Sequence, residues 1–168
     1  MIDFVESEMR FQFCEDKSFY IEKSHVYDKR LKGNGVSSVE CITLFRNKVV
    51  FIEAKSSAPN PETSNERFAD FIHHVVKKFK DSLSLCESMH SGLWPDRGMG
   101  KELAQTLYSN PEIQFILIIR NHKEKWSVQM QDALRKEMNS LLKIWKAELL
   151  VINGEQALKL NLVRHKGI

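Results

Sequence analysis

The chain has 168 residues, of which 42% are hydrophobic and 28% are charged, so it is long enough for one well-buried core and short for two. No stretch approaches the ~20 apolar residues that cross a bilayer, and the N-terminus has acidic residues where a signal peptide would be basic. We therefore expect one domain over residues 1–168, in the cytoplasm and without a membrane partner. The formal net charge of +3 does not by itself indicate nucleic acid.

The cysteines exclude two further classes of protein. Cys14, Cys41 and Cys86 are odd in number and widely spaced. This spacing favours neither a disulfide framework nor a cysteine-type zinc site, so we expect reduced thiols.

Two short strands are predicted near the N-terminus, at Met9–Phe13 and Ser18–Lys23. We expect both to extend the sheet formed by the residues that follow. A short helix capped by Ser24 is predicted over Ser24–Lys32, and Gly33-Asn34-Gly35 ends it because these residues tolerate positive φ.

A β-hairpin is the strongest prediction in the chain. Val36–Phe45 and Lys48–Lys55 are rich in β-branched and aromatic residues, and Arg46-Asn47 fits a two-residue turn between them. The polar and proline-containing residues after Lys55 end the second strand.

This hairpin places carboxylates opposite each other. A two-residue turn pairs Glu40 with Glu53, at a Cβ separation of ~4.5–5.5 Å where like charges repel. Lys55 lies on the same face as Glu53, because side chains alternate along a strand. The pair predicts a divalent cation, and its hard oxygen ligands suit Mg²⁺ or Mn²⁺. The alternative is an ordinary hairpin surface on which a lysine neutralises Glu40.

The rest of the chain predicts helices alternating with strands. A helix starting at Thr63 or Ser64 carries an apolar stripe that should cover the sheet. The remaining elements are a loop over 88–100, a short helix over 99–108, a buried strand over 112–120, a helix over 127–146 that Ser127 caps, and strands over 147–152 and 157–163. This order predicts a single-domain α/β fold with a mixed β-sheet flanked by helices.

Basic residues occur in four clusters that would neutralise phosphates if they converged near Glu53. They are Lys29-Arg30 with Lys32, Lys77-Lys78 with Lys80, Arg120 with His122, Lys123 and Lys125, and Arg164-His165-Lys166. Each cluster alone is typical of a solvated surface.

Glu40, followed on the next strand by Glu53-Ala54-Lys55 and then by a loop and a long helix, resembles the PD-(D/E)xK nuclease superfamily. The resemblance implies a restriction endonuclease-like core in which Glu40, Glu53 and the Ala54 carbonyl bind metal. It implies that Lys55 orients or helps to deprotonate the attacking water. It also implies an acidic ligand from an earlier element, for which we prefer Glu22 to Glu6, and a basic side chain from the long helix, for which we take Lys77.

The resemblance implies a Mg²⁺-dependent or Mn²⁺-dependent endonuclease that hydrolyses DNA in restriction, defence or repair, as a homodimer or within a larger assembly. The sequence departs from the family pattern at one point, because Ser38-Val39 precede a glutamate where a Pro-Asp pair is usual. This departure motivates an alternative, a catalytically inactive nuclease-like module that binds nucleic acid or a protein partner.

Overall fold

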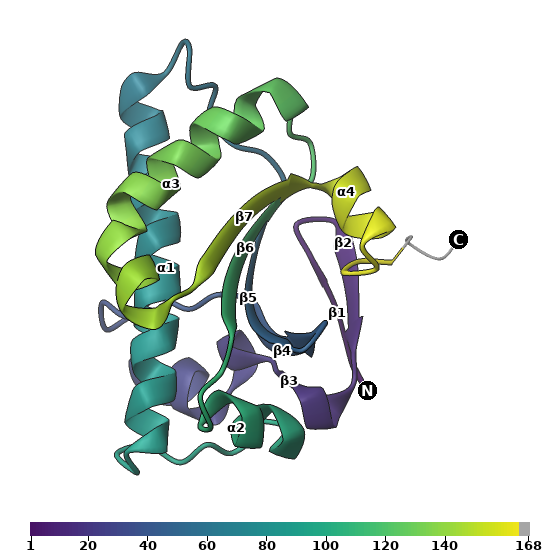
Figure 1. The fold of residues 1–168 in the computed structure, drawn as a ribbon, viewed down its shortest axis with the longest axis vertical. Helices are drawn as coiled ribbons and strands as arrows, with labels where there is room; N and C mark the ends of the chain where they lie inside the picture. The colour runs from purple at the N-terminus through teal and green to yellow at the C-terminus, as the bar shows by residue number, and fades with distance from the viewer. Residues whose placement is uncertain (165–168) are drawn as a thin grey trace.

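In the computed structural model, which describes residues 1–164, the elements are arranged around a five-stranded mixed sheet of order β3-β4-β5-β6-β7 (Figure 1). Strands β3 to β5 are antiparallel neighbours, and β5, β6 and β7 run parallel. The strands are β3 (Ser18–Phe19), β4 (Cys41–Phe45), β5 (Lys48–Lys55), β6 (Ile113–Ile119) and β7 (Glu148–Asn153). The predicted α/β fold with a mixed sheet is confirmed.

The predicted hairpin forms with the predicted register. Phe45 pairs with Lys48 across the turn, and Arg46 and Asn47 have φ values of 48° and 63°. Positive φ at both turn residues is the conformation whose twist suits two paired strands. Glu40 lies one residue before β4, and its amide donates a hydrogen bond of 3.1 Å to the carbonyl of Ile52. The first strand is therefore shorter than the predicted 36–45.

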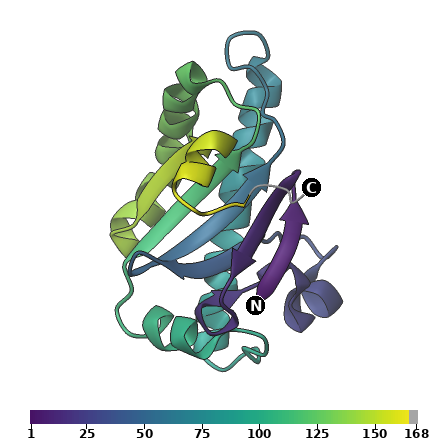
Figure 2. The ribbon, with the colours of Figure 1, turned by 90° about the vertical axis from the view of Figure 1, so that its right-hand side faces the viewer.

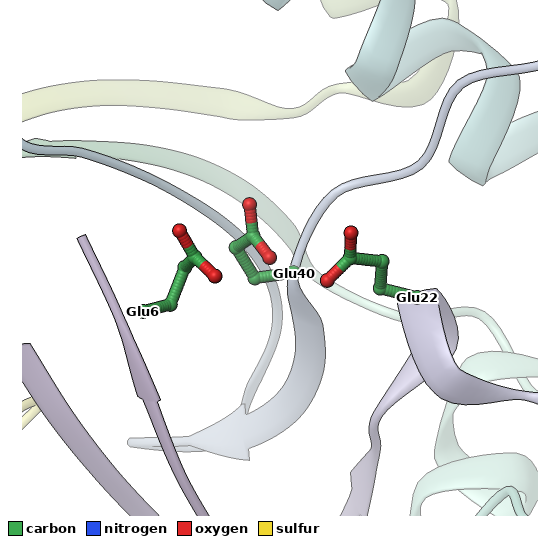
Figure 3. A group of neighbouring side chains, drawn as sticks. All are labelled: Glu6, Glu22 and Glu40. Atoms are coloured by element: carbon green, nitrogen blue, oxygen red, sulfur yellow. The ribbon is translucent and has the colours of Figure 1, made fainter.

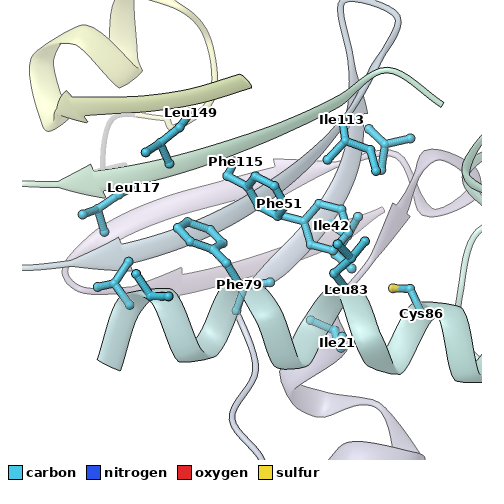
Figure 4. Packing of buried hydrophobic residues seen from close by; sticks show 14 of the residues in the cluster. Ile21, Ile42, Phe51, Phe79, Leu83, Cys86, Ile113, Phe115, Leu117 and Leu149 are labelled. Atoms are coloured by element: carbon cyan, nitrogen blue, oxygen red, sulfur yellow. The ribbon is translucent and has the colours of Figure 1, made fainter. Parts of the chain in front are cut away.

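Helices cover one face of the sheet. The long helix α1 (Asn65–His90) and α3 (Glu124–Trp145) pack on this face, with α2 (Lys101–Leu107) near one end (Figure 1). Phe115 of β6 lies 5.2 Å from Phe51 of β5 and 5.1 Å from Phe79 of α1, measured between ring centroids (Figure 4). The predicted apolar stripe of α1 therefore does cover the sheet.

A second hairpin and a short helix cover the other face. Strands β1 (Ile2–Glu6) and β2 (Met9–Phe13) pair only with each other among the named strands, and α4 (Gly154–Lys159) lies beside them (Figure 2). Phe11 of this hairpin is fully buried with Ile52, Ile116 and Ala157. Strand β5 is thus covered on both faces.

Three strand predictions are corrected. The strand over 9–13 is present but pairs with β1 rather than extending the main sheet. The strand over 18–23 ends at Phe19, and the 3-10 helix η2 (Ile21–Lys23) follows. The predicted strand over 157–163 is wrong, because Asn153 and Gln156 form a capping box that starts α4 instead.

Several helix boundaries also differ from prediction. The loop expected from residue 88 begins later, because α1 continues to His90. Helix α3 begins at Glu124, so Ser127 lies inside its first turn and does not cap it. Before Ser24 the chain forms two 3-10 turns, η1 (Glu15–Lys17) and η2. After Ser24 it forms the π-helix η3 (Tyr27–Leu31). Ser24 Oγ accepts a hydrogen bond of 3.2 Å from the Tyr27 amide.

Within residues 1–164, no helix is long and apolar enough to cross a membrane.

Arg164 forms a bridge with Arg10, whose carbonyl accepts from the Arg164 amide at 2.8 Å. The remaining residues of the predicted basic cluster, His165 and Lys166, lie outside the described residues.

Candidate metal and phosphodiester site

The C-terminal end of β5 carries a buried ion-pair cluster on the face that α1 covers. Glu53 is fully buried there. Its Oε1 lies 2.7 Å from Lys55 Nζ and 2.8 Å from Lys78 Nζ, and its Oε2 accepts from Lys78 Nζ at 3.1 Å. The contacts to Oε1 are close ion pairs without hydrogen-bond geometry. Glu53 is therefore neutralised from its own strand and from α1.

Glu40 connects this cluster to a group of carboxylates. Its Oε1 lies 3.4 Å from Lys78 Nζ. Its Oε2 is buried and has no hydrogen-bond partner among the described residues. A buried ionised carboxylate oxygen without a partner is costly, so this position favours either a bound cation or protonation of Glu40 itself.

The second group consists of Glu6, Glu22 and Glu40, which come from three separate elements (Figure 3). Glu6 ends β1, Glu22 lies in η2, and Glu40 precedes β4. One carboxylate oxygen from each lies within 4.8 Å of the other two. Glu6 and Glu22 are partly exposed while Glu40 is buried, so solvent can reach the group from one side.

The turn of the β1-β2 hairpin contacts the backbone between Glu53 and Lys55. Ser7 Oγ donates a hydrogen bond of 3.1 Å to the carbonyl of Ala54. The Ser7 amide in turn donates to Glu6 Oε1 at 2.9 Å. These bonds hold Glu6 close to the end of β5 and direct the Ala54 carbonyl toward the same turn.

Burial and like charge control the protonation of the site. Burial first, and then the charges of Glu53 and Glu22, raise the pKa of Glu40 from 4.5 to about 8, although Lys78 acts in the opposite sense. Burial also raises the pKa of Glu53, against the opposing effect of Lys78 and Lys55. Desolvation acts to lower the pKa of Lys78, but the two carboxylates raise it overall, so this ammonium stays charged.

The pKa of the neighbouring Tyr20 is also affected by the three glutamates. Burial and then the charges of Glu22, Glu40 and Glu6 raise the pKa of Tyr20 to about 12. Burial is the first cause of this shift, and the nearby glutamates add to it in the direction expected for a negative potential.

The structure brings the residues predicted from sequence together. Glu40, Glu53, Lys55, the Ala54 carbonyl and Glu22 all lie around the end of β5 or in contact with groups that do. The resemblance implies an acidic residue from an earlier element near the site, with Glu22 preferred, and a carboxylate oxygen of Glu22 lies within 4.8 Å of one of Glu40.

Two residues were missed or misjudged. The sequence favours Glu22 over Glu6, yet the carboxylate of Glu6 joins the same group. Lys77 was expected to approach the site, but it pairs with Asp81, and the neighbouring Lys78 reaches Glu53. The helical spacing indicates Lys78 rather than Lys77. Lys78 follows the buried Val75 by three positions and therefore lies on the same, sheet-facing side of α1.

No protein-family model, curated protein or solved structure matches the chain. The function must therefore be argued from the chemistry of this site. A negative group with one buried, unpartnered oxygen, beside two fixed ammonium groups, can hold a divalent cation and receive an anionic substrate.

Proposed function

We propose that the protein is a metal-dependent nuclease that hydrolyses DNA phosphodiester bonds. The observation that carries this proposal is the convergence of the Glu6, Glu22 and Glu40 carboxylates beside the Glu53-Lys55-Lys78 cluster. The antiparallel hairpin β4-β5, the parallel partner β6 and the covering helix α1 are compatible with the restriction endonuclease-like core implied by the sequence resemblance.

The side chains fit the expected Mg²⁺ or Mn²⁺. Both ions prefer hard oxygen ligands, and Mg²⁺ typically takes one or two carboxylates and keeps several waters. Glu40 and Glu22 would hold the ion, with Glu6 as a third carboxylate, and the unpartnered Oε2 of Glu40 supports this assignment. Glu53 and the Ala54 carbonyl adjoin this position, although in this structure they contact lysines and Ser7 respectively.

When bound, such an ion would supply an activated water and charge stabilisation for in-line attack at phosphorus. The protein's own residues do the positioning. Glu53 fixes the ammonium of Lys55, which is about one-third exposed and so faces the substrate side. There it adds positive charge where negative charge develops on the phosphate, and it orients the attacking water. Lys78 contacts both Glu53 and Glu40 and offsets the repulsion between them.

The test is nicking and linearisation of plasmid DNA with Mg²⁺, Mn²⁺ or EDTA. We compare the wild type with Glu40→Gln and Lys55→Met, and use Lys143→Met, an exposed lysine of α3, as the matched control. We expect cutting that requires metal, is reduced at least about a hundredfold in the two site variants, and is unchanged in the control. Thermal unfolding with Mn²⁺ checks binding separately, since Glu40→Gln should lose the metal-induced rise in Tm.

A second candidate function has a specific observation in its favour. The ammonium of Lys78 lies between Glu53 and Glu40 and already neutralises much of their charge. This arrangement suits a catalytically inactive module that binds nucleic acid or a protein partner. Such a module would retain its ligand after Glu40→Gln and would not cut DNA or RNA with either metal, whereas metal-dependent cutting excludes it.

A further inference from the structure

The turn between β1 and β2 reaches the proposed site through three successive residues. Glu6 joins the carboxylate group and Ser7 binds the Ala54 carbonyl. Glu8 makes an ion pair with the guanidinium of Arg120. Ser7 and Glu8 adopt φ values of 49° and 60°, which define a tight two-residue turn like that of the β4-β5 hairpin. The turn therefore fixes Glu8 beside the residues that follow β6.

Arg120 is held next to the proposed catalytic lysine by its backbone. It is the first residue after β6, and its amide donates to the Lys55 carbonyl at 2.8 Å. Its carbonyl accepts from the Gly154 amide at 3.3 Å. A Cβ on Gly154 would lie 3.2 Å from this carbonyl oxygen, so the close approach of α4 suits glycine. The sheet thus sets the backbone of Arg120 beside Lys55. Its side chain lies on the other face, beside α4, where it carries the ion pair with Glu8.

A cavity of about 300 Å³ opens beside the Glu8-Arg120 pair. This volume lies at the small end of the range of ligand pockets. The charged groups that line it are Glu8, Arg120, Glu155 and Arg164, with the amide side chain of Asn121 and the apolar residues Met9, Leu158 and Val163. If Glu8 withdraws, two guanidinium groups face a single remaining carboxylate.

We propose that this cavity binds a phosphate of the substrate strand next to the phosphate that is cleaved. The Glu8 carboxylate pairs with the Arg120 guanidinium until that phosphate displaces it. The proposal rests on the proposed nuclease function and identifies a substrate subsite for it. Guanidinium groups match phosphate and carboxylate with the same planar pair of donors, so one anion can replace the other without moving Arg120.

Exposure makes the exchange feasible. The side chains of Glu8 and Arg120 are 56% and 39% exposed, and an ion pair this accessible to water contributes little to stability. A phosphate diester brings a full negative charge and releases counterions from the nucleic acid when it meets arginine. Glu8 then acts as a competitor that excludes weak or isolated anions while yielding to a strand held at several points.

The experiment measures binding of a short fluorescein-labelled DNA duplex by fluorescence anisotropy, with EDTA present so that no cutting occurs. Arg120→Gln should weaken binding about tenfold and lower the slope of log K against log salt by about 1, the change expected for one lost phosphate contact. Glu8→Gln should tighten binding about twofold to fivefold, because it removes the competitor from an exposed pair. Arg135→Gln and Glu137→Gln, on exposed positions of α3, are the matched controls.

The opposite signs of the two effects separate this subsite from a general change in charge. The proposal is overturned if Arg120→Gln binds as tightly as Arg135→Gln, or if Glu8→Gln tightens binding no more than Glu137→Gln. Plasmid cutting with Mn²⁺ is read in parallel. Cutting by the wild type without these binding effects leaves the nuclease intact and removes the subsite, whereas the binding effects without any cutting retain the subsite and remove the nuclease.

Discussion

The two halves of β5 both pair with β6 and both face α1, yet they differ in chemistry. In the first half Val49 and Phe51 point toward α1 and are fully buried among other apolar side chains. In the second half Glu53 and Lys55 point to the same side, and Glu53 is equally buried. One half is stabilised by packing alone, and the other depends on charges that must neutralise one another.

This difference indicates where the protein gives up stability. Apolar residues would fill the second half at lower cost, since replacing a buried ion pair by well-packed hydrophobic residues is often neutral or stabilising. Instead the chain buries Glu53 and Glu40 there and brings Lys78 from α1 to meet them. A costly polar arrangement next to an efficient apolar one is expected at a functional site, in agreement with the function proposed here.

The largest expected effect lies in the apolar half. Phe51→Ala removes a fully buried ring that contacts Phe115 and leaves a cavity in the core. We expect the free energy of unfolding to fall by about 3–5 kcal/mol. Urea denaturation measures this change, and Val5→Ala, at a position that is 56% exposed, is the control that should stay within about 0.5 kcal/mol of wild type. A loss below about 1 kcal/mol for Phe51→Ala would mean that this half is not the packed core.

A somewhat smaller effect is expected in the charged half. Lys78→Met leaves the Glu53 and Glu40 carboxylates buried with only Lys55 nearby, and we expect a loss of about 2–4 kcal/mol at neutral pH. The double variant Lys78→Met/Glu53→Gln removes charges of both signs and should recover about half of this loss. The same denaturation measurement applies to both variants.

The adjacent Lys77→Met provides a matched control for Lys78→Met. Lys77 has the same side chain on the same helix, but it pairs with Asp81 at the surface and should cost less than about 1 kcal/mol. Equal losses for the two lysine variants would contradict the distinction between a buried cluster and a surface pair.

The same contrast explains what could be predicted from the sequence. The hairpin, its turn and its register follow from local signals, namely alternating strand residues and the two turn positions at Arg46 and Asn47. A two-residue turn fixes the register, so it could be predicted without knowledge of the rest of the fold that Glu40 and Glu53 lie at the same end of the hairpin, where both contact Lys78.

The residues that complete the site depend on contacts between distant parts of the chain. Glu6 comes from a hairpin whose place on the other face of the sheet no local pattern specifies. Lys78 is an exception, because its three-residue spacing from the buried Val75 places it on the sheet-facing side of α1, and local spacing could have identified it. The error over 157–163 has a local cause, since the capping box of Asn153 and Gln156 was present in the sequence and outweighs the strand-like residues that follow it.

The smallest expected change, counted for each pH unit, is in the dependence of the free energy of unfolding on pH. It comes from the charged half alone. The folded protein holds the pKa of Glu40 at about 8, whereas the ordinary value is 4.5. Between these two values the unfolded chain has released its proton and the folded chain has retained it. Unfolding therefore releases a proton, so the free energy of unfolding falls as the pH rises through this window and levels off above it. We expect a decrease of about 1 kcal/mol for each pH unit between pH 5 and 8, measured by urea denaturation in EDTA.

Glu40→Gln should reduce this slope, and Glu53, whose pKa burial also raises, should account for what remains. Glu148→Gln, an exposed residue paired with Lys48, is the control and should keep the slope of the wild type. Mn²⁺ sharpens the comparison, because a cation beside Glu40 favours its ionised form and should flatten the slope of the wild type without affecting Glu40→Gln. A slope that is unchanged both by Glu40→Gln and by Mn²⁺ would show that the buried carboxylates do not titrate in this window and that no cation binds beside them.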